Sequence, residues 1–165
     1  AVAQYRLATL QERGMGVKAA TARARVWYQR AAEQGNLKAM HNLAVMSASP
    51  ANGTPDYDTA AKLFTDAAER GLADSQYNLA ILAESGLGMQ KDLVAAYKWY
   101  TLAAKAGDQD AARRRDLLIP RLTHDMIRNS EKQISAWRPQ PGNTSANDAR
   151  MAAEAWKQHI AEKSR

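Results

Sequence analysis

The chain has 165 residues, of which 45% are hydrophobic, and a formal net charge of +6 at pH 7. It contains no cysteine, which excludes a disulfide framework and a thiolate metal site. It also has no run of about 18 apolar residues, so the sequence predicts no membrane-spanning helix.

The basic excess lies in the last third of the chain. Residues 1–110 hold 12 Lys and Arg against 11 Asp and Glu, whereas residues 111–165 hold 11 against 6. A basic C-terminal segment can attract nucleic acid, anionic lipid or an anionic polymer, or it can simply keep a surface soluble. No aromatic residues alternate with its arginines, so the sequence does not predict nucleic-acid binding.

A period of 36 residues runs through the first two-thirds of the chain. Each unit reads as two short helices joined by a turn, and neither helix can bury its apolar side alone. The sequence therefore predicts an all-α fold, a right-handed α-solenoid of helix-turn-helix repeats with C-terminal capping helices. The 36-residue step relates Leu7, Leu43 and Leu79; Ala24, Ala60 and Ala96; Tyr28, Phe64 and Tyr100; and Gly35, Gly71 and Gly107.

In the first repeat, a helix is expected to end near Arg13. The second helix is expected to begin at Thr21 as its cap, because Ala20 stands where the other repeats have Asp. The chain starts inside this helical pattern, which indicates a fragment of a longer protein. The three repeats are predicted at about residues 3–35, 36–71 and 72–107.

In the second and third repeats, Asp56 and Asp92 are the expected helix caps. The second repeat replaces the glycine turn of the others by a loop, residues 50–55, that begins and ends with proline. Two prolines stiffen that loop and remove backbone donors. Gly71 is expected to end its helix with a positive φ.

A half-repeat from Asp108 to Leu118 is expected to close the array. Its Arg115 stands where the repeats have leucine, as a terminal unit with a solvated outer face requires. Thr123 is the expected cap of a further helix that ends near Trp137. The predicted divisions are a solenoid at 1–137, a Pro-containing linker at 138–145 and a helical tail at 146–165.

The third repeat resembles the Sel1-like repeat, a relative of the tetratricopeptide repeat. The resemblance rests on YNLA, GLG, the capping Asp92, KWY, LAAKAGD and the closing Ala111, and it covers residues 3–111. It departs in the second repeat, which lacks both turn glycines, and in the first, which lacks the capping Asp. The resemblance implies an α-solenoid that binds proteins.

The order of segments behind the array narrows the resemblance. KAGDQDAARRRDLL, then RLTHDM and AW, then a Pro-containing linker and a late Trp are similar to the C-terminal part of PodJ-type polar localisation factors of alphaproteobacteria. That resemblance implies a periplasmic module of a cell-pole scaffold. It also implies a soluble fragment that an upstream segment tethers to the inner membrane.

The sequence predicts neither an enzyme nor a bound cofactor or metal. Its three histidines, His41, His124 and His159, are scattered, and no HExxH, GxSxG or Walker sequence occurs. The GxG sequences fall at the repeat turns, where they are explained without phosphate binding.

Two groups of residues behind the repeats have two readings each. The run Arg113, Arg114 and Arg115 is either an anion-binding cluster for phosphate, carboxylate or glycan, or the solvated face of the capping half-repeat. Trp137 and Trp156 lie outside the period, so each is either an anchor of the tail on the array or a hot spot for a partner.

In each of the three repeats, a polar residue directly precedes the leucine that recurs with the 36-residue period. Arg6, Asn42 and Asn78 hold this position, and the leucines after them are expected to face inward. One polar position per repeat either presents a hydrogen-bonding ladder to an extended peptide or is an ordinary exposed helix position. The predicted partner is therefore a protein or peptide. A peptidoglycan-contacting module, a periplasmic regulator of a signalling protein and a subunit that supports a lytic enzyme stay as alternatives.

Overall fold

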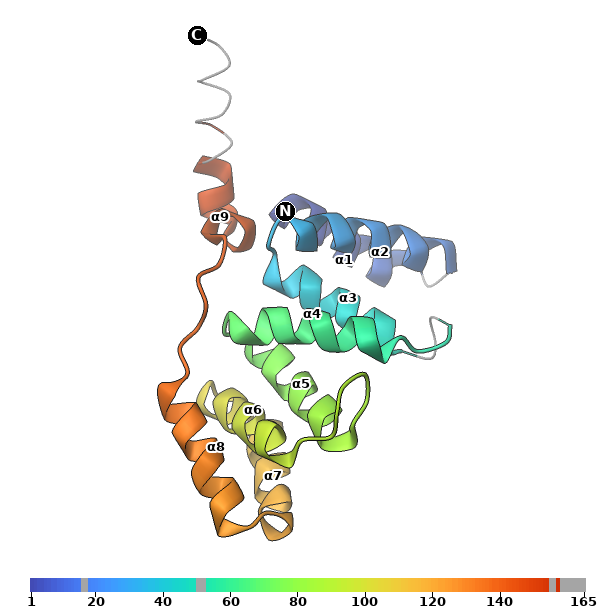
Figure 1. Ribbon diagram of the computed structural model, residues 1–165. Coiled ribbons are helices and arrows are strands. Elements are labelled where there is room, and N and C mark those ends of the chain that lie inside the picture. Colours follow the sequence, from blue (N-terminus) through green and yellow to red (C-terminus); the bar gives the residue numbers. More distant parts are fainter. Residues whose placement is uncertain (16–17, 50–52, 155–156, 158–165) are drawn as a thin grey trace. The chain divides into compact units, whose positions relative to one another are not determined.

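A computed structural model describes residues 1–15, 18–49, 53–154 and 157 (Figure 1). Over these ranges the chain forms helices and no strand, as the sequence predicts for an all-α solenoid. Helical residues 149–154 follow the last labelled helix. The labelled helices are α1 (Val2–Met15), α2 (Lys18–Glu33), α3 (Leu37–Ala48), α4 (Tyr57–Glu69), α5 (Ala73–Ser85), α6 (Leu93–Lys105), α7 (Gln109–Leu118), η2 (Ile119–Arg121), α8 (His124–Ala136) and α9 (Thr144–Asn147).

The helices belong to two compact units. Unit 1 comprises Ala1–Met46 together with Pro141–Arg165, and unit 2 comprises Ser47–Gln140. Within the described residues, none of the helices combines the length and the apolar character needed to cross a membrane.

Each second helix of a repeat ends in the same hydrogen-bonded turn. Gly35, Gly71 and Gly107 have φ of 89°, 91° and 103°, as expected for Gly71 from the sequence. In each turn the glycine N–H and the following N–H donate to carbonyls three and five residues earlier, as in the pairs Gly71 to Ala68 at 2.9 Å and Leu72 to Ala67 at 3.0 Å. This is the Schellman arrangement, which satisfies carbonyls that the helix end would leave without donors.

Most predicted helix starts are found. Asp56 accepts from the Thr59 N–H at 3.0 Å, Asp92 accepts from two backbone N–H groups, and Thr123 accepts from the Met126 N–H at 3.2 Å. The prediction of Thr21 as a cap is wrong, because α2 begins at Lys18 and Thr21 lies within it. Two alanines, which have the highest helix propensity, precede Thr21 and allow the helix to start earlier.

The expectation that all three repeat leucines face inward holds for two of them. Leu43 is 9% exposed and Leu79 is 1% exposed, but Leu7 is 38% exposed. In the described part of unit 1, the helix that packs closely on α1 is α2. That contact buries Ala8 and the Tyr28 ring, and it leaves Leu7 at its margin.

Helix α6 is the centre of unit 2. It packs against α5, α7 and α8, and α4 packs against α5. The buried side chains of this core include Phe64, Leu79, Trp99, Tyr100 and Leu118. Helix α8 runs along α6 (Figure 1), where Ile134 is buried and the Ser130 hydroxyl donates to the Val94 carbonyl at 3.1 Å.

The loop after α5 lies directly on the first turn of α4. A Cβ atom added to Gly88 would stand 2.0 Å from the Tyr57 carbonyl oxygen, whereas one added to Gly107 would meet nothing within 4 Å. Gly88 therefore permits close backbone approach, and Gly107 serves only its positive φ.

Replacing these two glycines by alanine should separate the two roles. Gly88→Ala forces backbone apart and should cost about 3 kcal/mol of unfolding free energy, whereas Gly107→Ala adds only φ strain of about 1–2 kcal/mol. Urea unfolding followed by circular dichroism measures both values. Equal costs, or a larger cost at Gly107, would contradict the packing of this loop on α4.

Candidate functional site

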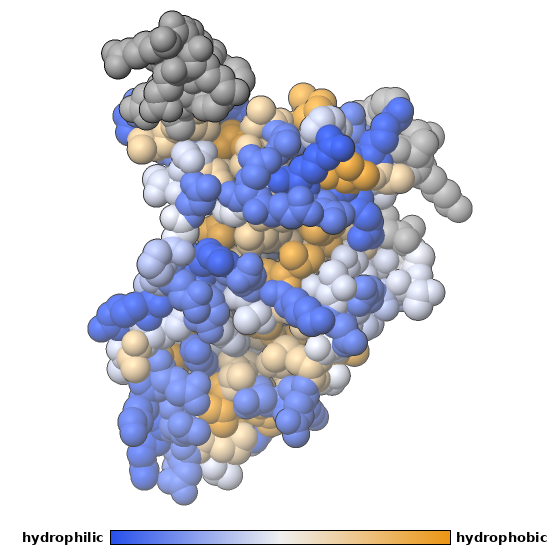
Figure 2. All heavy atoms as spheres, turned by 45° about the horizontal axis from the view of Figure 1, so that its top comes forward, coloured by the Kyte–Doolittle hydropathy of each residue, from blue (hydrophilic) through white to orange (hydrophobic). Residues whose placement is uncertain are grey.

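The candidate surface lies on the first helices of the repeats. On the face shown in Figure 2, hydrophilic side chains predominate and hydrophobic ones appear in small areas between them. In unit 1, Arg6 is exposed on α1 and Asn42 is half-buried on α3. In unit 2, Asn78 is half-buried on α5, where its amide donates to the Asp74 carbonyl at 3.1 Å.

The polar series has a fourth member that the sequence reasoning assigned elsewhere. Arg114 follows Asn78 by one 36-residue period and is exposed on α7. Arg114 belongs to the arginine run, and one more step of the 36-residue period also leads to it. Unit 2 thus carries two members of the series, Asn78 and Arg114.

The arginine run does not form one cluster. Arg113 pairs with Asp110, and Arg115 pairs with Asp116 at 2.7 Å. Arg114 faces Tyr100 and Tyr77 instead, and their phenols raise the pKa of its guanidinium. Successive helix residues point about 100° apart, so three neighbouring side chains reach three different places.

The buried Tyr100 lies next to the exposed Arg114. The Tyr100 hydroxyl donates to Glu84 at 2.9 Å, and Arg121 forms an ion pair with the other oxygen of the same carboxylate. The ring of Tyr77 lies 5.9 Å from that of Tyr100, tilted by 56°. Burial raises the pKa of Tyr100 far above 10, and the hydrogen bond to Glu84 and its negative charge raise it further.

The chemistry that this surface offers is hydrogen-bond donation. The Arg114 guanidinium and the Asn78 amide stand on neighbouring first helices, and the Tyr77 ring adds an apolar contact. Such a set suits backbone carbonyls and carboxylates. Within the described ranges, no group of three or more His, Cys, Asp or Glu residues could hold a metal ion.

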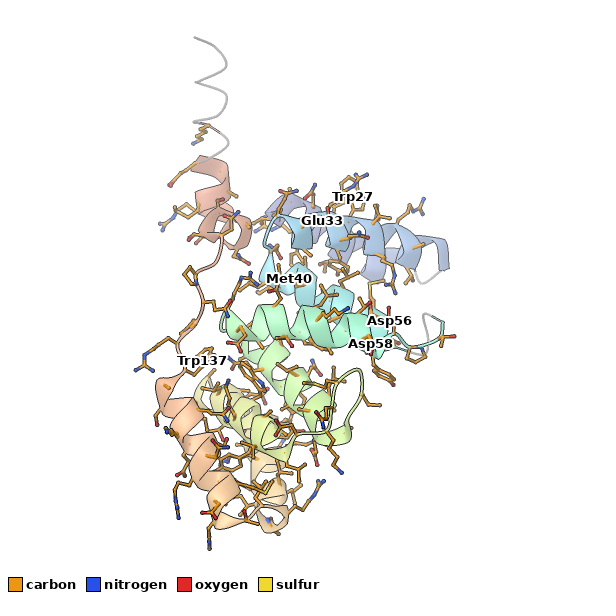
Figure 3. The ribbon with its side chains drawn as sticks, in the orientation of Figure 1. Trp27, Glu33, Met40, Asp56, Asp58 and Trp137 are labelled. Atoms are coloured by element: carbon orange, nitrogen blue, oxygen red, sulfur yellow. The ribbon has the colours of Figure 1, made fainter. Side chains whose placement is uncertain are left out.

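Trp137 lies at the end of α8 and contacts two repeats of unit 2 (Figure 3). Its indole N–H donates to Glu69 at 3.1 Å, and its ring meets that of Trp99 edge-on at 6.3 Å. The chain then passes the glycine turn of the second repeat, where the Gln140 N–H donates to the Glu69 carbonyl at 2.8 Å. Trp156, the other predicted tail anchor, lies outside the described residues.

Within unit 1, the segment that begins at Pro141 contacts the turn between α2 and α3 through asparagines that the sequence analysis does not single out. Asn143 donates to the Gln34 carbonyl at 3.1 Å, and Asn147 donates to the Gly35 carbonyl at 3.0 Å while accepting from the Leu37 N–H. Asn36 in turn donates to the Ala146 carbonyl. These contacts satisfy backbone groups of the turn between α2 and α3. In the sequence, the one signal for these contacts is that two asparagines, Asn143 and Asn147, flank a short polar segment.

Comparison with known proteins shows which family the repeats resemble. A model of the Sel1 repeat matches residues 1–36, 37–72 and 73–108. A Sel1 repeat protein from Oxalobacter formigenes is 31% identical, with a TM-score of 0.63, over 70% of this chain and 86% of that one. A search of curated proteins found no match.

A longer structure has a similar fold. The protective antigen c5321 of uropathogenic Escherichia coli, which displays an SLR fold, matches 81% of this chain with 23% identity and a TM-score of 0.67. The chain spans 37% of the length of that protein.

Removing the Tyr100 hydroxyl should change how stability depends on pH. The folded-state pKa of Tyr100 is raised above its unfolded value of about 10, so its contribution is complete below pH 10 and is lost as the pH rises above it. Tyr100→Phe should cost about 1–2 kcal/mol at pH 8 and should make the loss of stability above pH 10 less steep.

Urea unfolding at pH 8 and at several values above pH 10 tests this expectation. Tyr97→Phe, a half-buried position on the same helix, is the matched control. An alkaline slope that is the same in the wild type and in Tyr100→Phe would contradict the assigned role of the Tyr100 proton.

Proposed function

Because this chain belongs to the Sel1 repeat family, we propose that it is a non-enzymatic module that binds a protein partner along the first helices of its repeats. Sel1 repeat proteins generally mediate protein–protein interaction. The proposal adds the surface, which in unit 2 comprises Asn78 and Arg114, and the ligand, an extended peptide segment of the partner.

The observation that carries the proposal is the arrangement around Arg114 in unit 2. Second helices use their apolar sides for packing, as the buried Ala96, Tyr100 and Ala103 of α6 illustrate. First helices retain a polar position, which is Asn78 on α5 and Arg114 on α7. Arg114 is exposed and held beside Tyr77, which limits the side-chain entropy that it loses on binding.

The finer part of the proposal concerns the place of the module in the cell. The order of half-repeat, Trp-ending helix and Pro-containing linker supports a PodJ-type polar localisation scaffold. On that proposal the module is periplasmic, and an upstream segment tethers it to the inner membrane. The partner is then a protein at the cell pole.

Peptidoglycan is the second candidate ligand, because Arg113 and Arg114 are both exposed on α7. Exposed guanidinium groups can bind the carboxylates of stem peptides. Arg113 already has a carboxylate neighbour in Asp110, which favours the protein partner over the cell wall.

The double variant Asn78→Ala with Arg114→Ala should weaken partner binding by about tenfold or more, which is about 1.4 kcal/mol. A photoreactive residue at position 78 identifies the partner in cells, and calorimetry with the purified partner gives the Kd. Glu131→Ala with Lys132→Ala, at exposed positions on α8, is the control that should bind normally.

Sedimentation with purified peptidoglycan sacculi tests the competing ligand. The protein should stay in the supernatant at physiological salt. Salt-dependent pelleting that survives Asn78→Ala but is lost in Arg113→Ala with Arg114→Ala would replace the protein partner by the cell wall.

A further inference from the structure

An exposed leucine of α7 stands between two side chains that contact α5. Leu117 is 76% exposed, the highest value among the large apolar side chains that the structure describes. It lies three residues after Arg114 and four before Arg121, spacings that keep side chains on one side of a helix. Arg114 lies beside the hydroxyl of Tyr77, and Arg121 forms an ion pair with Glu84. Leu117 is therefore flanked by contacts with α5 on both sides.

The corresponding residue of α5 is also apolar. Tyr77, Ile81 and Glu84 follow one another at spacings of four and three residues, so they form a row on α5. Ile81 is half-buried and lies one 36-residue period before Leu117. Because the ends of the two rows are in contact, the apolar side chains stand next to each other between them. We call Tyr77, Ile81, Arg114 and Leu117 the α5–α7 face.

Arg114 supplies a positive charge that the chain itself does not pair with a carboxylate. The other arginines of α7 and η2 each form an ion pair: Arg113, Arg115 and Arg121. Among the described residues, Arg114 takes part in none of the ion pairs. Glu84 acts on its charge, but one oxygen of that carboxylate accepts from Tyr100 and the other from Arg121. A carboxylate that approaches the α5–α7 face from outside therefore finds a donor ready in Arg114.

The described chain does not supply such a carboxylate in an extended segment. Every acidic residue in it lies within a helix or caps the first turn of one. The helices next to α7 in the chain also pack elsewhere, since α6 contacts the buried side of α7 and α8 packs against α6. Charge complementarity at Arg114 thus favours an acidic segment that comes from another molecule.

The spacing on α7 sets how the two groups are arranged in that segment. Arg114 and Leu117 lie about 4.5 Å apart along the helix axis. Alternate side chains of an extended strand share one face and lie about 7 Å apart. The flexible stem of the arginine covers the difference. An acidic and an apolar side chain two residues apart therefore reach both positions at once.

We propose that the α5–α7 face binds an extended segment of another protein in which an acidic and an apolar side chain lie two residues apart. The carboxylate accepts hydrogen bonds from Arg114, and the apolar side chain packs on Leu117 and Ile81. This inference rests on the proposed function, because it specifies which peptide the first helices of unit 2 select.

Randomised peptides displayed on phage, selected on the immobilised protein, are the probe. The selected sequences should be enriched in Asp or Glu two positions from Leu, Ile, Met or Phe. Selection on Arg114→Gln should lose the acidic preference and keep the apolar one, whereas Leu117→Ser should do the reverse. Because both side chains are exposed, the two variants should keep the melting temperature of the wild type.

A synthetic peptide with the selected consensus gives the Kd by calorimetry. Arg114→Gln and Leu117→Ser should each weaken its binding about tenfold. Replacing the peptide's acid by the amide should weaken binding to the wild type by a similar factor and leave binding to Arg114→Gln unchanged. Two controls, Arg128→Gln on α8 and Ile119→Ser on η2, change exposed residues outside the face and should bind normally.

Three outcomes would overturn the inference. The first is a set of selected peptides without the acidic preference; if their binding is still lost in Asn78→Ala with Arg114→Ala, the proposed function survives alone. The second is no enrichment over Arg114→Gln with Leu117→Ser, in which case the partner crosslinked at position 78 decides the proposed function separately. The third is a photo-crosslink from position 117 of the full-length protein to its own polypeptide, which would make the occupant an internal segment.

Discussion

The connection between successive helix pairs depends on a glycine held in the left-handed region. An L-residue with a side chain would pay about 1–2 kcal/mol in that conformation. The two backbone hydrogen bonds of each turn fix where the chain leaves the second helix, and so where the next first helix begins. In unit 2 the turns at Gly71 and Gly107 lead into α5 and α7, which pack on α4 and α6. The buried Ala67 and Ala68 before Gly71, and Ala103 before Gly107, let these helices approach closely.

Local features of this fold were predictable because each is determined within a few residues. The glycine turns and the caps at Asp56 and Asp92 follow from backbone chemistry, and the structure has them all. Thr21 was misassigned because capping preference competes with the helix propensity of the alanines before it. Leu7 was misassigned for a different reason: the burial of a helix face depends on a neighbouring helix, which the period alone does not supply.

In the candidate site, too, local features were predictable from the sequence and contacts between distant segments were not. Its residue types and spacing were visible in the sequence, and continuing the period by one step places Arg114 in the series. The separation of the arginine run into three directions also follows from helix geometry. The contacts of Asn143 and Asn147 with the turn after α2 could not be predicted, because they join residues more than a hundred positions apart. No periodicity relates the tail to the repeats.

The hydroxyl of Tyr100 and the carboxylate of Glu84 have an evolutionary consequence that the three repeats record side by side. One period earlier the two positions are Phe64 and Ala48, and two periods earlier they are Tyr28 and Glu12. In the sequence of these three repeats the phenol and the acid occur together or are absent together, while in the structure the Tyr28 hydroxyl lies 3.3 Å from that of Thr9. A buried hydroxyl without its acceptor is costly, and so is a carboxylate without its donor. In the third repeat, a change at either position would leave the other without its hydrogen-bond partner, so we expect the two to change together.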